Sequence, residues 1–296
     1  MLFFCQTFLQ NFSKYSVNCS TNYKNALFFH TITTGHYWRN SYIKELQLLK
    51  RVDSCNWKIE IWKTEKEEEE YDLLELLSSR LKEVSVLAGY NSSSFHIPYL
   101  TQKYKAYGLE DPFFNLTHYD LLKELKPIGN AFHLSLKLKD LQLYLKLDEQ
   151  EPEIRCIFEA LNLFSFQEVF QGDFSIDKFD QLDQELLVTI TSEASLAIPL
   201  HFFRPAFYFI GEGTDIRLKI KLYDNRLRVY FPNYKDYYYL PLEDMAIHKS
   251  IAASLPKETR EKATEETCYT YTPIRPDMTT EQLKKYIKTL FKTIIV

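Results

Sequence analysis

Two groups of side chains in the second half of the sequence have types and spacing that could do chemistry. Asp244 and His248 are four residues apart, so on a helix they would share a face, as metal ligands sometimes do, although a salt bridge or helix cap is the interpretation we prefer. The other group combines aromatic surface with positive charge, which suits stacking on single-stranded bases but also fits a β-rich core. It consists of Tyr234, Lys235, Tyr237, Tyr238 and Tyr239.

The composition gives no global attraction to a polyanion. The 296 residues carry a formal net charge of -4, so any contact with nucleic acid must come from a local basic groove. The five cysteines are scattered and odd in number, with no pair at zinc-ligand spacing, which favours a reduced, cytoplasmic protein. The apolar start at Met1 lacks a basic region and is interrupted by Gln6 and Gln10, so we expect neither a signal peptide nor a membrane helix.

The first half of the chain alternates strand and helix signals. Residues 26–32 form an apolar and β-branched run before a Thr-Thr-Gly turn, residues 57–62 alternate apolar and charged side chains, and residues 84–88 are apolar, so each run predicts a strand. Residues 42–49 fit either a strand or a helix. The acidic run at residues 65–70 precedes leucines at helical spacing, and a second helix is expected around Pro98. This order predicts a mixed α/β sheet.

The second half is richer in β signals. Strand-like runs cover residues 186–190, 206–210, 216–223 and 226–231, and the Asp224-Asn225 turn predicts that the last two form a hairpin. The chain ends with a predicted helix, in which Thr279 and Gln282 have capping-box spacing. Its apolar face consists of Leu283, Tyr286, Ile287, Leu290 and Phe291, and the opposite side carries lysines. We expect this helix to pack on its own domain.

The first predicted strand, with its turn, reads LFFHTITTG over residues 27–35. It resembles the first motif of the DEDD exonucleases, a strand that ends in Asp-x-Glu-Thr-Thr-Gly. In that family the two carboxylates project from the same side of the strand and hold divalent metals that activate water for phosphodiester hydrolysis. His30 and Ile32 occupy these two positions here.

The segment YNSSSFHIPYL, residues 90–100, is similar to the second motif of the same family, an Asn-Gly-x-x-Phe-Asp-x-Pro-Tyr-Leu loop that enters a helix. His96 stands where the family has its metal-binding Asp. The resemblance makes Tyr90, Asn91 and Phe95 candidates for nucleic-acid binding. Two motifs that match in order are a stronger signal than either motif alone.

Later segments are similar to the YprB-type RNase H-like proteins within the DEDD 3′-5′ exonuclease superfamily. These segments are residues 119–122, 138–141, 230–241, 243–250 and 268–269. The resemblance implies an α/β fold with an RNase H-like mixed sheet flanked by helices and a β-rich C-terminal extension that ends in a helix. It implies an N-terminal segment over residues 1–25, an exonuclease-type domain over residues 26–170 with a shortened third motif, and an extension over residues 171–296.

The third motif of the family, a His-Asn-x-x-Asp-like segment on a late helix, has no convincing counterpart, and Glu153 is our candidate for its acid. The family uses Mg²⁺ or Mn²⁺, but most ligands are missing, so we expect no metal cofactor. A sharper hypothesis has His30 and His96 binding a softer metal such as Zn²⁺ or Mn²⁺, with Glu153 or Asp120. We prefer that both histidines are hydrogen-bonded remnants and that Asp120 caps a helix.

These observations predict a degenerate RNase H-like protein that binds single-stranded DNA or RNA and hydrolyses phosphodiesters weakly or not at all. We leave its status as an enzyme open. The alternative is a protein-interaction or scaffolding module whose cleft has no ligand role, and a decaying gene product is a third possibility. We expect no membrane partner.

Overall fold

The structure is a computed structural model that describes residues 23, 25–53, 56–231, 233–274 and 278–294, together with the backbone of residues 3–10. The chain divides into two compact units, Met1–Phe164 (unit 1) and Ser165–Val296 (unit 2). Within the described part of the chain, no helix has the length and apolar character that crossing a membrane requires.

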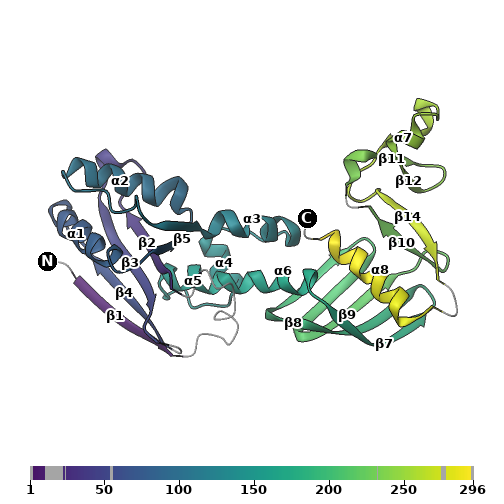
Figure 1. Cartoon of the computed structure of the whole chain (residues 1–296), viewed down its shortest axis with the longest axis horizontal. Coiled ribbons are helices and arrows are strands. Elements are labelled where there is room, and N and C mark those ends of the chain that lie inside the picture. The colour runs from purple at the N-terminus through teal and green to yellow at the C-terminus, as the bar shows by residue number, and fades with distance from the viewer. Residues whose placement is uncertain are drawn as a thin grey trace. The chain divides into compact units, whose positions relative to one another are not determined.

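Unit 1 is built around a mixed sheet with helices on both faces (Figure 1). Its strands are β1 (Phe3–Gln10), β2 (Leu27–Thr33), β3 (Ile43–Arg51), β4 (Asn56–Lys63), β5 (Val86–Gly89) and β6 (Thr117–Asp120). Its helices are α1 (Glu70–Leu81), α2 (Ile97–Ala106), α3 (Leu121–Phe132), α4 (Leu138–Tyr144) and α5 (Glu153–Glu159). One-turn helices cover Trp38–Asn40, Glu67–Glu69, Ser92–His96 and Ala160–Leu163, and the turn at Ser92–His96 is of the π type.

The strand order is β1-β4-β3-β2-β5-β6. β2 lies inside the sheet, antiparallel to β3 and parallel to β5, and β6 is parallel to β5. The predicted mixed sheet is therefore confirmed, and the ambiguous run at residues 42–49 is a strand. The sequence analysis assigned no element to Phe3–Gln10, which pairs with β4 along its whole length.

Alternation along β2 sends its side chains to two different layers. Leu27 and Phe29 pack under α1 and α2 in one core cluster. Phe28 faces the other way, and its ring lies 5.2 Å from that of Phe158 on α5. His30 continues the row of Phe28, so it lies on the α5 side of the sheet.

Helix α1 begins where the acidic run predicted, but Glu70 is fully buried instead of solvated. Its carboxylate accepts a hydrogen bond from the Ile43 amide at 2.7 Å and lies 2.8 Å from the Lys103 ammonium of α2. A buried carboxylate needs such partners because the low-dielectric interior penalises an unpaired charge. The pair therefore connects both helices to the start of β3.

The chain turns sharply between β5 and α2. Gly89 ends β5, and a Cβ atom there would lie 2.7 Å from Cβ of Ser92 and 2.8 Å from the Phe29 ring, so only glycine fits without movement of its neighbours. Asn91 adopts a left-handed conformation, with φ 52°, before the π turn. Pro98 is the second residue of α2, where its missing N–H costs no helical hydrogen bond.

Unit 2 contains two short antiparallel sheets beside a larger one. The sheet β7-β8-β9 consists of β7 (Phe174–Leu182), β8 (Glu185–Arg204) and β9 (Phe207–Lys221). The others pair β10 (Arg226–Tyr230) with β14 (Tyr269–Pro273), and β11 (Tyr237–Leu240) with β12 (Met245–His248) and β13 (Glu261–Lys262). Its helices are α6 (Phe164–Gln171), which begins at the last residue of unit 1, α7 (Lys249–Ala252) and α8 (Thr280–Lys292), with one turn each at Tyr234–Asp236 and Lys257–Thr259.

Two strand predictions for unit 2 were wrong in detail. The runs at residues 206–210 and 216–223 belong mostly to one long strand, β9, whose pairing with β8 shifts register near Gly211 and Gly213. The Asp224-Asn225 turn has positive φ at both residues, as a type I′ turn requires, but only one bridge, between Tyr223 and Arg226, follows it. β10 then pairs with β14 instead, because tertiary pairing overrides the local turn signal.

The terminal helix α8 agrees with its prediction. Thr279 and Gln282 form the expected capping box, and all five predicted apolar residues are buried. Phe291 packs against Phe170 and Phe174, with ring centroids 4.8 and 5.6 Å away. On the polar side, Lys284 and Lys288 each lie 2.9 Å from the Asp173 carboxylate, so α8 packs on its own unit.

Candidate functional site

His30 lies near the carboxyl end of β2 and is 6% exposed. Its Nε2 lies 2.5 Å from Oε2 of Glu153, the first residue of α5. This hydrogen bond lowers the pKa of Glu153, against the opposing effect of burial. Nδ1 of His30 is buried and has no hydrogen-bond partner among the described residues.

Gln47 fixes the position of Glu153. It lies opposite His30 in the β2–β3 register and is 2% exposed. Its side-chain oxygen accepts a hydrogen bond at 2.8 Å from the backbone N–H of Ile154, in the first turn of α5. A side chain from the sheet thus satisfies one of the free amides at the start of this helix. Because Glu153 precedes Ile154, this contact holds its carboxylate beside His30.

His96 comes to the same place from the π turn before α2. Its ring centroid lies 4.6 Å from that of His30, and its Nδ1 is 2.6 Å from the Thr31 hydroxyl. Burial, with a smaller effect of the neighbouring His30, lowers the pKa of His96 to about 3, although a hydrogen bond with the Tyr90 backbone acts in the opposite direction. His96 is therefore a neutral imidazole at physiological pH.

Asp120 acts as the helix cap that the sequence favoured. One carboxylate oxygen accepts from the Leu122 amide at the start of α3, and the other accepts from the backbone and hydroxyl of Ser93 at 3.0 and 2.5 Å. Burial alone would raise the pKa of Asp120, but these hydrogen bonds hold it below its ordinary value. The cap thus also fixes the turn that carries His96.

The residues at this site do not fit a two-magnesium centre. Mg²⁺ prefers several hard oxygen ligands in octahedral geometry, whereas this site has one carboxylate, two imidazoles and the hydrocarbon side chain of Ile32. Nε2 of His30 and Oε2 of Glu153 are already hydrogen-bonded to each other. Among the residues that the structure describes, no group of three or more His, Cys, Asp and Glu side chains could hold a metal ion.

Comparison with known proteins agrees with this architecture. Residues 27–164 match the RNase_H superfamily. The matched range runs from the start of β2 to the end of unit 1, so unit 1 has an RNase H-like fold, and the β-rich region that ends in a helix follows it. No protein of curated function matches the sequence.

Solved structures with some likeness to the chain include three of exonuclease I. A product-bound structure is 10% identical with a TM-score of 0.37, over 91% of this chain and 70% of that one. The E. coli enzyme with a dA16 oligonucleotide is 10% identical with a TM-score of 0.37, and the match covers 91% of this chain and 72% of that one. The zinc-bound form of the E. coli enzyme with single-stranded DNA is 10% identical with a TM-score of 0.36, and the match covers 92% of this chain and 74% of that one. Likeness at this level says nothing about the activity of this chain.

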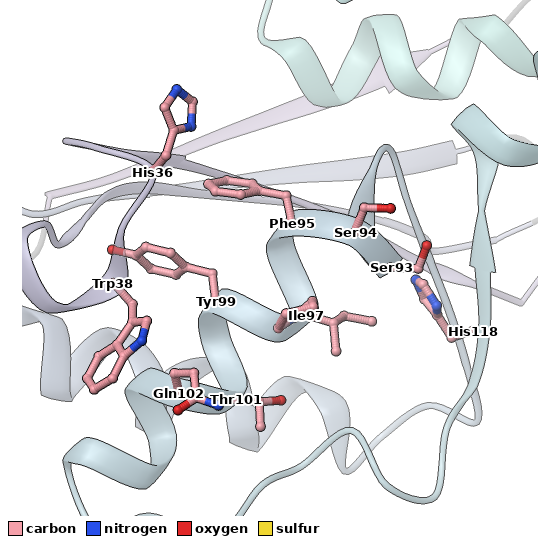
Figure 2. A pocket seen from close by; sticks show the side chains of 11 residues that line it. His36, Trp38, Ser93, Ser94, Phe95, Ile97, Tyr99, Thr101, Gln102 and His118 are labelled. Carbon is pink, nitrogen blue, oxygen red and sulfur yellow. The ribbon is translucent and has the colours of Figure 1, made fainter.

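A pocket of about 630 Å³ opens in the RNase H-like unit beside the His96 turn (Figure 2). Its lining includes His36 and Trp38 after β2, Phe95 in the π turn, Tyr99 on α2 and His118 on β6. Ser93, Ser94, Ile97, Pro98, Thr101 and Gln102 complete it. The rings of His36 and Phe95 lie 5.7 Å apart at its edge, and the exposed Arg39 lies 5.0 Å from the Trp38 ring. The pocket therefore offers aromatic faces and hydroxyls, with the exposed cation of Arg39 nearby.

The three residues predicted for nucleic-acid binding take different positions in the RNase H-like unit. Phe95 lines the pocket. Asn91 is exposed at the start of the π turn. Tyr90 is only 3% exposed, and its hydroxyl donates to the Leu136 carbonyl, so its ring packs inside the unit and offers no face to a base.

The sequence analysis missed His36, Trp38 and His118 as pocket residues. A usable signal existed for the first two, because they follow the Thr-Thr-Gly turn at the carboxyl end of β2, the edge where ligands of open α/β sheets bind. His118 lies on β6, which the sequence did not reveal, and its Nε2 lies 2.8 Å from the Ser92 hydroxyl. Only the parallel pairing of β5 and β6 brings it to the pocket.

The candidate groups of unit 2 have other roles. Asp244 and His248 do not share a helix: Asp244 lies in the turn before β12, and His248 caps α7 through its Nδ1. Asp244 accepts hydrogen bonds from Tyr239, Tyr269 and Tyr271. Burial opposes its ionisation, but these bonds lower the pKa of Asp244 to about 2. The spacing of the two residues therefore reflects a structural cluster and a cap.

Proposed function

We propose that unit 1 is a nucleic-acid-binding module of the RNase H-like type, of the YprB kind, that has lost metal-dependent phosphodiester hydrolysis. The observation that carries the proposal is the hydrogen bond between His30 and Glu153. At the positions where the exonuclease motifs carry acids, an imidazole and a carboxylate satisfy each other. A pair of this kind is stable without a metal ion.

Binding of a single strand would rest on the aromatic pocket. Bases stack on aromatic side chains whatever their sequence, and each stacked base contributes roughly 1–3 kcal/mol. Trp38 and Phe95 supply such side chains, and the exposed Arg39 beside Trp38 supplies a cation for a phosphate. Asp120 holds Ser93, one of the lining residues, by accepting a hydrogen bond from its hydroxyl. No chemical step follows from this arrangement.

The test combines a nuclease assay with a binding assay on the full chain. End-labelled single-stranded DNA and RNA are incubated with Mg²⁺, Mn²⁺ or Zn²⁺ and with EDTA, and we expect no shortening in any arm. Metal-dependent shortening that disappears in His30→Ala would show an active metal centre and refute the proposed loss of hydrolysis.

Binding is measured by fluorescence anisotropy with the same oligonucleotides. We expect Trp38→Ala and Phe95→Ala to weaken it roughly tenfold each, as loss of a stacking platform does. The matched control is Phe114→Ala, since Phe114 is 92% exposed and lies outside the pocket. Equal affinities for all three variants would contradict a role of the pocket, and no binding by the wild type at low salt would favour a protein-interaction module.

A further inference from the structure

Unit 2 exposes a tyrosine surrounded by cations on the sheet β12-β11-β13. Tyr238 lies on the central strand β11, with Lys262 of β13 opposite it in register. The Arg260 guanidinium carbon lies 4.9 Å from the Tyr238 ring centroid, and the Lys249 ammonium of α7 lies 6.0 Å from it. Three positive side chains, one from α7 and two from the stretch that forms β13, therefore meet around one partly exposed ring.

The two faces of this small sheet differ in character. Tyr237 and Tyr239, the neighbours of Tyr238, point to the opposite face, where they pack with Ala246, Ala263 and Cys268. That face is a core. Tyr238 projects from the other face, and it is bordered by Ile247 of β12 on the side away from Lys262. Tyr238 is thus not needed for the packing of its own sheet.

The cations of this face are free for an external anion. Within the described residues, none of Lys249, Arg260 and Lys262 forms an ion pair with a carboxylate. Arg260 is held in place because its guanidinium donates to the Ala252 carbonyl at the end of α7. A guanidinium that is fixed before binding loses less conformational entropy when an anion arrives. Lys249 and Lys262 are exposed on either side.

We propose that Tyr238, Lys249, Arg260 and Lys262 form a second binding surface for single-stranded nucleic acid, on unit 2. The three cations would contact successive phosphates, and the tyrosine ring would stack on a base. This combination distinguishes nucleic acid from other polyanions, because phosphates alone need no aromatic platform. The surface explains how a chain with a net charge of -4 attracts a polyanion locally. The proposal deepens the function proposed above and rests on it.

The experiment measures affinity for single-stranded DNA and RNA at several salt concentrations, with the full chain. Tyr238→Ala is expected to weaken binding roughly tenfold at all salt concentrations, because it removes stacking. The double variant Lys249→Glu/Lys262→Glu is expected to weaken binding most at low salt and to reduce the salt slope by about 1–2, because phosphate contacts release counterions. Thermal unfolding of each variant checks that the fold is kept.

The matched control is Lys178→Glu/Lys285→Glu, which changes the net charge equally at two exposed positions of unit 2 outside the surface. If both surface variants keep full affinity and an unchanged salt slope while Trp38→Ala still weakens binding, this proposal is overturned. The function proposed for unit 1 then stands. Equal weakening by the control pair would also overturn it. A third outcome would assign the surface to acidic peptides instead. In that case the lysine variant loses binding of polyglutamate as well as of DNA, and Tyr238→Ala has no effect on either.

Discussion

At the scale of single residues, hydrogen bonds hold the candidate site together. His30, His96 and Glu153 lie together, and Nε2 of His30 and Nδ1 of His96 each have a protein partner, whereas Nδ1 of His30 has none among the described residues. A cluster of carboxylates repels itself unless a cation is present, whereas this set is stable alone.

Neutral His96 makes the stability of unit 1 dependent on pH. The pKa of His96 is lowered from 6.5 to about 3, so below pH 6.5 the unfolded chain binds a proton that the folded chain does not. His96 therefore does not lower the free energy of unfolding above pH 6.5. As the pH decreases from 6.5 toward 3, this free energy falls by at most about 1.4 kcal/mol per pH unit. Urea unfolding between pH 7.5 and 5 should show this decline, and His96→Asn should flatten it.

His36 provides the control for this measurement, because it is an exposed histidine at the pocket edge. His36→Asn should leave the decline unchanged. A wild-type stability that is constant down to pH 5 would contradict a buried neutral His96.

Restoring the acids tests the correspondence with the exonuclease motifs. The variant His30→Asp/Ile32→Glu/His96→Asp places three carboxylates beside Glu153. Their mutual repulsion should lower the melting temperature without metal, and Mg²⁺ or Mn²⁺ should recover it, because a ligand that binds only the folded state stabilises it. The wild type and the single variant Ile32→Glu should show no such metal-dependent shift. Absence of a shift in the triple variant would mean that these positions do not converge as ligands.

At the scale of elements, polar side chains at helix starts position the site. Asp120 caps α3 and holds the π turn, and Gln47 of β3 holds the first turn of α5. Both contacts satisfy amides that have no partner inside their helix. The geometry around His30 and His96 therefore depends on these caps as much as on the sheet.

The capping box of α8 gives a quantitative test of the same principle. Thr279 accepts from the Gln282 amide, and the Gln282 side chain accepts from the Thr279 amide. Thr279→Ala should destabilise unit 2 by about 1 kcal/mol, the usual cost of losing an N-cap. Thr280→Ala, one residue inside the helix, is the control and should be nearly neutral. Equal losses in the two variants would argue against the cap.

At the scale of the whole molecule, each unit has its own core. Leu27, Phe29 and the leucines of α1 form one in unit 1, while Phe170, Phe209 and Phe291 pack together in unit 2. Because each unit has a core of its own, we expect each unit to unfold as a cooperative step of its own.

Phe291→Ala tests this expectation. The loss of a buried phenylalanine typically costs about 3–5 kcal/mol, so unit 2 should unfold at a lower temperature while unit 1 keeps its transition. Calorimetry, with hydrogen exchange to assign each transition to its residue range, measures both. A single transition that moves as a whole would show that the units unfold together.

The sequence by itself determined the local elements whose signals are contained in neighbouring residues. The strand β2, the helix α1 and the capped α8 with its five buried residues could be predicted because periodicity and caps act over a few positions. The resemblance to two motifs also made His30, Ile32 and His96 candidate site positions, and Glu153 was a candidate for a third motif without a convincing counterpart. The roles of these four residues stay predictions. The two-residue turn at Asp224 was correct locally, but the hairpin was wrong because β10 had a better partner far along the chain.

Only the tertiary structure decided what these residues do. Glu153 meets His30 because α5 packs on the sheet and is held by Gln47, and no local pattern encodes a contact between segments so distant. The burial that keeps His96 neutral and hides Tyr90 is likewise a property of the assembled unit. The same holds for His118 at the pocket and for the cations around Tyr238, which come from α7 and the stretch that forms β13. Sequence fixes which groups are available, and packing fixes their neighbours, on which their charge and exposure depend.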